Sequence, residues 1–274
     1  MSLEKIVYIL WAPRSWDREK IRRLLLEGCA PELRGQGAAK LQMNIADCYA
    51  EVRSPAPGVP FETPMCAQVN VWVAEIESRF ALEGVLRRAG FLVAGYLVDE
   101  QVCTDYGGNA HSAPRDWPDG ERSPGVLAVT LMERPRRLDH DEWIRRWHGR
   151  LSPVSEAMQP RARYVRNVVK NALTPGAPSF EGIAEEAWPS FEHVTNPFLF
   201  YGAGNVFQLV KNMATMLRTV LSFLTLWRIR TVMTSEYFLR SEPADRAGIR
   251  CVRPRGSRAH GPRARRDSGR AGRR

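Results

Sequence analysis

The sequence contains the same order of strand and helix patterns twice, and this repeat restricts the fold more than any other feature. Residues 5–13 form a β-rich run that ends at a proline, and residues 126–135 form a second such run. The proline and the aspartate that follow each run recur at an offset of 122: Pro13 and Asp17 in the first half, Pro135 and Asp139 in the second. We therefore expect a chain made of two copies of one unit.

Each copy is expected to follow the order β-α-β-β-α-β. For the first half, the patterns predict strands at 5–13, 41–47, 66–74 and 91–102 and helices at 17–34 and 78–89. For the second half, they predict strands at 126–135, 164–170 and 230–239 and helices at 139–158 and 205–227. The second half is about 14 residues longer, and we expect the surplus to add a short helix near 179–190.

Four strands with two helices on one side form a ferredoxin-like unit, whose open sheet face needs a partner. A second copy supplies that partner. The predicted fold class is α+β, with two ferredoxin-like β-α-β-β-α-β repeats packed sheet to sheet as a pseudo-dimeric α+β barrel whose interior can be partly hollow. The expected boundaries are a first repeat at 1–106, a linker at 107–123, a second repeat at 124–240 and a tail at 241–274.

The positive charge of the chain is concentrated in that tail. The whole sequence carries 40 basic and 30 acidic residues, a net charge of +10. Residues 241–274 hold eleven arginines and three acids, a net +8, which leaves +2 for the remainder. The tail lacks aromatic residues and apolar periodicity, so we expect it to be disordered. A nucleic-acid-binding arm is the alternative interpretation, but the near-neutral repeats give no reason to expect nucleic acid as a partner.

The sequence carries no sign of a targeting signal, a metal site or a nucleotide cofactor. The N-terminal apolar run, residues 6–12, is too short for a signal peptide, and the most hydrophobic later stretch, 213–227, is interrupted by Arg218. The five cysteines are scattered without a C-x-x-C pair or zinc-ligand spacing. We therefore expect a cytoplasmic protein with reduced thiols, no membrane segment, no metal and no cofactor.

Several segments resemble proteins with tandem EthD domains, which belong to the dimeric α+β barrel superfamily. The resemblance rests on LQMNIAD at 41–47, DEWIRRWHGRLSPV at 141–154, YVRNVVKNALTP at 164–175, EGIAEEAWP at 181–189 and SEYFL at 235–239. It implies the barrel fold and small-molecule chemistry such as cofactor-independent oxygenation, haem degradation or polyketide cyclisation. The family helix commonly places a histidine where this chain has Leu151, and the nearest substitute is His148, three residues earlier.

Three residues are candidates for acid and base catalysis. His148 can exchange protons near neutral pH, and a helix of this fold faces the cavity. Glu185 and Glu186 lie beside Trp188, where an apolar pocket can shift the pKa of a carboxyl group. The alternatives are a packed or solvated histidine, and acidic side chains that pair with arginines at the surface.

Six residues are candidate ligand contacts. Asn44 and Asn167 recur at one position of the repeat, in mid-strand, where asparagine is disfavoured unless its amide is used. The other candidates are Trp147 and Trp188 beside the expected catalytic residues, His193 as part of a lid, and Tyr201 with an inward hydroxyl group. A purely structural role is the alternative for each of them.

The residues and the resemblance together suggest an EthD-like protein that binds or transforms a small hydrophobic molecule in the barrel cavity, by acid/base or by oxygenase- or cyclase-type chemistry. Whether it is an enzyme is left open. If it is one, monooxygenase-like or lyase-like reactions are expected. The alternative is a non-catalytic protein that holds a ligand for a partner enzyme. The duplicated chain completes the barrel alone, although it could also form a homodimer.

Overall fold

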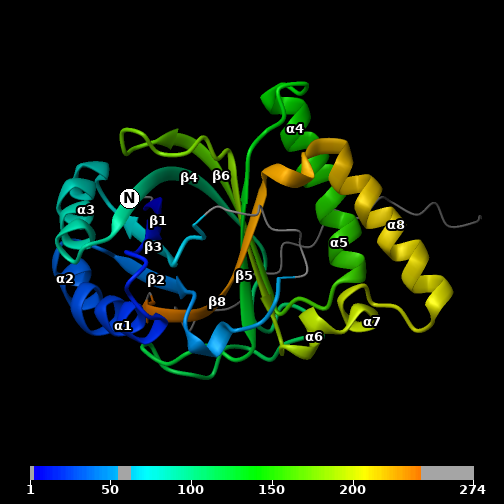
Figure 1. Ribbon diagram of the computed structural model, residues 1–274, viewed down its shortest axis with the longest axis horizontal. Helices are drawn as coiled ribbons and strands as arrows, with labels where there is room; N and C mark the ends of the chain where they lie inside the picture. Colours follow the sequence, from blue (N-terminus) through cyan, green and yellow to red (C-terminus); the bar gives the residue numbers. More distant parts are fainter. Residues whose placement is uncertain (1–2, 55–62, 242–274) are drawn as a thin grey trace, which may run out of the picture. The chain divides into compact units, whose positions relative to one another are not determined.

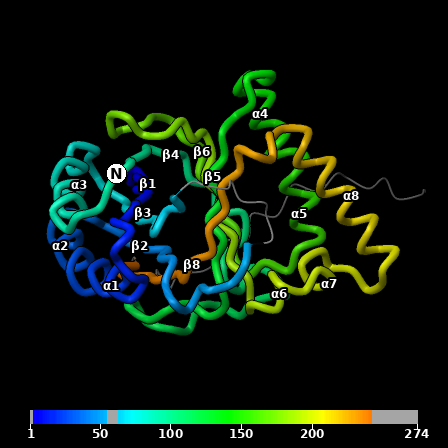
Figure 2. The backbone as a smooth tube through the Cα atoms, in the orientation of Figure 1, coloured from blue at the N-terminus to red at the C-terminus, as the bar shows by residue number. Residues whose placement is uncertain are grey.

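A computed structural model describes residues 3–54 and 63–241 of the chain. Its centre is a closed barrel of eight antiparallel strands in the order β1-β3-β2-β8-β5-β7-β6-β4 (Figure 1). Closure gives every strand a neighbour on both sides, so no backbone edge of the sheet is left open. The tube trace in Figure 2 shows the helices lying outside this ring of strands.

The first half follows the predicted order closely. Its elements are β1 (Glu4–Trp11), α1 (Arg18–Arg23), η1 (Leu24–Cys29), α2 (Ala30–Gly35), β2 (Lys40–Ile45), η2 (Cys48–Ala50), β3 (Ala67–Val73), η3 (Ile76–Ser78), α3 (Arg79–Arg88) and β4 (Leu92–Thr104). The side chain of Asp17 caps α1 by accepting a hydrogen bond from the backbone NH of Lys20. The first of the two recurring aspartates therefore caps a helix.

The second half has the same order of elements with additions before its last helix. Its elements are β5 (Val126–Met132), α4 (His140–Arg146), η4 (Trp147–Leu151), α5 (Ser152–Met158), β6 (Arg163–Ala172), β7 (Gly182–Trp188), α6 (Glu192–Thr195), α7 (Pro197–Phe200), α8 (Val206–Phe223), η5 (Leu226–Arg228) and β8 (Ile229–Arg240). Asp139 caps α4 through the backbone NH of Glu142, which repeats the arrangement at Asp17.

The helix expected near 179–190 is wrong, because this segment forms strand β7. Ile183, Glu185 and Ala187 face the barrel interior, and the intervening side chains face the helices. Two adjacent glutamates resemble a solvated helix face in the sequence, but the strand sends them to opposite faces. The additional helices of this half are α6 and α7, which follow the strand.

The two halves join along the edges of their sheets. Each half orders its strands as fourth, first, third and second, and the pairs β2–β8 and β4–β6 close the ring. The halves are thus continuous through hydrogen bonds, and the predicted α+β class with a closed barrel is confirmed. The inner faces of the two curved sheets oppose each other across the barrel interior.

The first helical segment of each half contains a π-helical turn at an equivalent place. Residues 24–29 and 147–151 both adopt this wider turn, 122 to 123 residues apart. Such turns are rare and change the direction of the side chains that follow them. In the second half the turn carries Trp147 and Leu151 to the sheet. The predicted disordered basic tail at 241–274 lies outside the described residues apart from Ser241.

Candidate functional site

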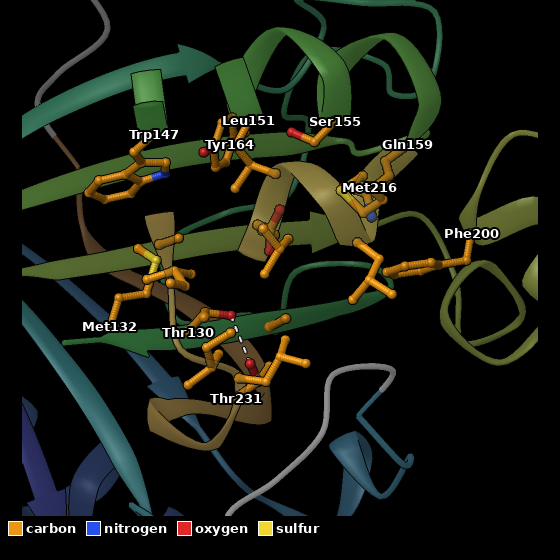
Figure 3. A pocket seen from close by; sticks show the side chains of 18 of the residues that line it. Thr130, Met132, Trp147, Leu151, Ser155, Gln159, Tyr164, Phe200, Met216 and Thr231 are labelled. Atoms are coloured by element: carbon orange, nitrogen blue, oxygen red, sulfur yellow. Dashed lines mark hydrogen bonds between the residues drawn. The ribbon is translucent and has the colours of Figure 1, made fainter. Parts of the chain in front are cut away.

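The second half contains a mostly apolar cavity of about 220 Å³ between the outer face of its sheet and the helices (Figure 3). Side chains from β5, β6, β7 and β8 form its floor, and η4, α5, α7 and α8 supply its walls. The lining residues are Ala128, Thr130, Met132, Trp147, Leu151, Ser155, Gln159, Tyr164, Ala184, Glu186, Trp188, Phe200, Tyr201, Met216, Leu217, Val220, Leu224, Leu226, Ile229 and Thr231. A concave, apolar space with a few polar groups is typical of a small-molecule site.

Gly182 sets the position of one wall of this cavity. A Cβ atom at this residue would come within 2.7 Å of the rings of Trp143 and Trp147. The missing side chain therefore lets both indoles approach the backbone of β7, and their ring centroids lie 5.2 Å apart. Trp147 is 1% exposed, so the close approach fixes a rigid aromatic surface beside the cavity.

An ion pair between Arg161 and Glu186 is the main charged feature of the cavity. The Arg161 side chain is 3% exposed, and the Glu186 side chain is 22% exposed and lines the cavity. Arg161 also donates a hydrogen bond to Ser155 Oγ at 3.0 Å, and its guanidinium carbon lies 3.9 Å from the centroid of Tyr164. The arginine is held on three sides, so its carboxylate partner has a fixed place in the wall.

Two pairs of hydroxyl groups add to the polar part of the cavity. Tyr164 Oη lies 3.1 Å from Ser152 Oγ, and Thr130 Oγ1 lies 3.0 Å from Thr231 Oγ1. Burial raises the pKa of Tyr164, so the phenol keeps its proton at neutral pH. The cavity thus offers one carboxylate, neutral hydroxyl groups and extensive apolar surface, which suits a hydrophobic molecule with one or two polar substituents.

A second polar cluster lies inside the barrel and centres on Glu185, whose side chain has no exposed surface. It accepts hydrogen bonds from the amides of Asn167 at 2.8 Å, Gln68 at 2.9 Å, Asn70 at 3.0 Å, Asn44 at 3.3 Å and Gln42 at 3.4 Å. Lys5 Nζ lies 3.2 Å from the same carboxylate. We call these seven side chains the Glu185 cluster.

The charges of the Glu185 cluster are balanced within the barrel. Arg163 Nη1 lies 3.6 Å from Glu185 and 3.1 Å from Glu236, and Lys5 also binds Glu100 at 2.8 Å. Burial alone would raise the pKa of Glu185, but Lys5, Arg163 and the hydrogen bond from Asn167 lower it to about 2. Burial raises the pKa of Glu236 above its usual range despite Arg163. Glu185 is therefore a permanent buried anion.

The structure divides the predicted site residues between these two places. Asn44, Asn167 and Glu185 meet inside the barrel. The remaining cavity residues from the prediction are Trp147, Glu186, Trp188 and Tyr201. Side chains without exposed surface, including Val7, Val129 and Ile183, occupy the middle of the barrel, so the cavity described above lies at a different place from the barrel interior in which a ligand was expected.

His148 does not line the cavity, although it was expected to replace the family histidine. Its ring packs on Trp147 with the centroids 5.1 Å apart, and burial together with the charge of Arg166 lowers its pKa to about 4. His148 and Leu151 are three positions apart, which is less than one helical turn, so their side chains point in different directions. The π-helical turn has more residues per turn and increases this difference. Leu151, three residues later, does line the cavity.

His193 lies on α6 and is also absent from the cavity lining. Its Nδ1 atom is 2.8 Å from Ser190 Oγ, so the imidazole stabilises the loop between β7 and α6. These contacts do not support the lid that was predicted from His193.

Sequence reasoning missed several residues that the structure brings to the two sites. Arg161, Ser155 and Tyr164 were not predicted as cavity residues, because nothing local marks them. The amide pairs Gln42 and Asn44, and Gln68 and Asn70, did carry a signal. Amides at alternate positions of two strands predict one polar face, and that face lies inside the barrel.

No family model matches the chain, and no curated protein matches its sequence. Solved structures do match its fold. An anthrone oxidase-like protein is 11% identical with a TM-score of 0.52, over 88% of this chain and 96% of that chain. This likeness shows the fold alone, which is that of a dimeric α+β barrel formed here within one chain.

Two further solved structures give lower scores. A dye-decolorizing peroxidase from Bacteroides thetaiotaomicron is 10% identical with a TM-score of 0.48, over 87% of this chain and 94% of that chain. A chlorite dismutase from Candidatus Nitrospira defluvii is 7% identical with a TM-score of 0.42, over 86% of this chain and 92% of that chain.

Within residues 3–54 and 63–241, no three His, Cys, Asp or Glu side chains gather as a metal site. In the same part of the chain, no helix has the length and apolar character needed to cross a membrane.

Proposed function

We propose that the protein binds and transforms a small hydrophobic molecule in the cavity between the second-half sheet and its helices. The observation that carries this proposal is the ion pair of Arg161 and Glu186 in the wall of an otherwise apolar cavity. A carboxylate at such a place can accept a proton from a bound molecule, while Arg161 balances the charge that remains. Tyr164 can hydrogen bond to a carbonyl or hydroxyl substituent.

The proposal includes a tandem arrangement of two ferredoxin-like repeats of the EthD kind, at 1–106 and 124–240, joined by a linker at 107–123. The equal strand order of the two halves and their equivalent π-helical turns support this duplication. The cavity described above lies in the second half, so we assign ligand binding to that half. The first helical segment of the other half packs directly on its sheet through Leu25, Cys29 and Leu33.

The proposed reaction class follows from the carboxylate of Glu186 and from the resemblance of the sequence to EthD-domain proteins. Removal of a proton from an activated C–H or O–H group leaves an electron-rich anion, which can react with dioxygen or close a ring. Anthrone, which the name of the structural neighbour mentions, is a suitable first probe because its oxidation to anthraquinone consumes one dioxygen and releases one water. Spectrophotometry would measure the anthraquinone formed, and an oxygen electrode would measure the dioxygen consumed.

The test compares the full chain with Glu186→Gln and with Glu192→Gln, a matched change on α6 outside the cavity. Native mass spectrometry of each purified protein would show any retained small molecule. A retained ligand or anthrone turnover that only Glu186→Gln impairs supports the proposal. Equal behaviour of all three proteins would refute the role of Glu186. A bound ligand without turnover would favour the alternative, a non-catalytic carrier for a partner enzyme.

A further inference from the structure

Helix α8 exposes large apolar side chains along most of its length. The exposed fractions are 66% for Val206, 82% for Phe207, 60% for Val210, 44% for Met213, 49% for Leu217 and 45% for Leu221. Single exposed apolar residues are ordinary, but a contiguous row of them marks an interaction surface. In Figure 1, α8 runs along the outer side of α5, on the flank away from the barrel.

Helical geometry places these side chains on one outward face. At about 100° per residue, the six residues and Ala214 fall within an arc of about 120°. The face that packs on the protein contains Met216, Val220 and Phe223 and lies beside this arc. The apolar surface of α8 therefore spans about 200°, about three times the roughly 60° of the face that packs on its own barrel, and polar side chains occupy the rest of the helix.

With the exception of Phe207, whose mirror position is the inward Val220, the outward row is symmetric about the point between Met213 and Ala214. Val206 and Leu221 lie equally far from this midpoint, and so do Val210 and Leu217. An antiparallel copy of the helix would therefore place each valine opposite a leucine, with Met213 and the small Ala214 at the axis. Residues that match in this way are what a two-fold, self-complementary interface requires.

The charged residues of α8 lie outside the apolar arc. Lys211 and Arg218 are both on the same side of it. In the antiparallel register Lys211 is level with Met216 and Arg218 with Leu209, so neither cation meets its own copy, and Lys211 comes within two residues of the level of the partner's Arg218 at the edge of the contact.

We propose that the outward face of α8 is a dimer interface, at which two copies of the chain pair their α8 helices antiparallel about the midpoint between Met213 and Ala214. The proposal concerns a surface and does not depend on the reaction assigned to the cavity. Leu217 belongs to both places, so the second copy would also cover the outer wall of the cavity.

Sedimentation of the full chain over a range of concentrations tests the association. We expect twice the chain mass for the wild type, and a dissociation constant raised at least about 30-fold by Val210→Glu. Gln208→Glu is the matched control, since it places the same charge on the polar side of α8 and should dimerise as the wild type does. Circular dichroism verifies that each variant is folded; Leu217→Asn is the second variant if Val210→Glu unfolds.

Site-directed cross-linking tests the register. In a chain with Cys48→Ser and Cys251→Ser, Ala214→Cys should cross-link with a short bismaleimide. Val206→Cys alone should not, because its two copies would lie about 22 Å apart along the axis. A mixture of Val206→Cys and Leu221→Cys chains should cross-link. A monomer at all concentrations, a dimer that survives Val210→Glu, or an unlinked Ala214→Cys chain would overturn the proposal. So would a monomer that floats with phosphatidylcholine vesicles, which would identify a lipid surface instead.

Discussion

Asn44 on β2 lies opposite Glu236 on β8, in one of the two strand pairs that join the halves of the chain. Asn167 on β6 lies opposite Glu100 on β4 in the other pair. Each asparagine therefore faces a glutamate of the other half, as a two-fold repeat requires. The hydrogen bonds of the two side chains do not follow this symmetry. Both amides reach Glu185, which belongs to the second half alone.

Removing the Glu185 carboxylate should destabilise the fold strongly. Glu185→Ala would leave Lys5 and Arg163 in the barrel with fewer counter-charges, and loss of one partner from a buried ion pair costs about 3–5 kcal/mol. Urea unfolding of Glu185→Ala and of Glu192→Ala, the same change at an exposed position of α6, would measure the difference. A loss below about 1 kcal/mol for Glu185→Ala would show that the cluster rearranges around the gap.

Stability should fall in acid because Glu185 must take up a proton. Its pKa is about 2 in the folded protein and 4.5 without the fold, so its contribution is complete above pH 4.5 and is lost as the pH falls toward 2. Glu185→Gln should flatten the pH dependence of the free energy of unfolding in this window. An unchanged slope for Glu185→Gln would assign the acid sensitivity to other carboxyl groups.

A second acid-sensitive window is expected from His148. Burial, together with Arg166, lowers its pKa to about 4 from 6.5, so the folded state prefers the neutral ring. Its contribution is complete above pH 6.5 and is lost as the pH falls from 6.5 toward 4. His148→Gln should therefore reduce the loss of stability in this range, as measured by thermal unfolding in buffers of different pH. His111→Gln in the exposed linker is the control and should leave the curve unchanged.

A negative charge at Asn44 should be poorly tolerated. Asn44→Asp would remove the amide donor to Glu185 and Gln68 and would add a carboxylate beside Glu185. We expect a loss of about 2–4 kcal/mol in urea unfolding. Asn171→Asp makes the same change at an exposed position of β6 and should alter the stability by less than about 0.5 kcal/mol. Similar losses for both variants would argue against a specific role of the cluster.

The repeat predicted most of the fold, because strand patterns, capping aspartates and recurring asparagines are local signals. The segment at 182–188 was missed because Glu185 and Glu186 are adjacent, and only the opposing faces of β7 distinguish a buried anion from a cavity residue. The pairing of Arg161 with Glu186 spans 25 positions and depends on the strand register. The place of His148 depends on a π-helical turn that the sequence does not mark.

The cavity can be tested at the position where the family places its histidine. Leu151→His would bring an imidazole to the lining of the cavity, which also contains the hydroxyl groups of Ser155 and Tyr164. If the cavity is the reactive site, this variant should change anthrone turnover or ligand retention by at least about tenfold, because a positioned acid or base contributes factors of about 10² or more. His148→Gln removes an imidazole outside the cavity and should leave both measurements unchanged. If His148→Gln impairs them and Leu151→His does not, the chemistry lies on the other side of the helix, and the assignment of the cavity is wrong.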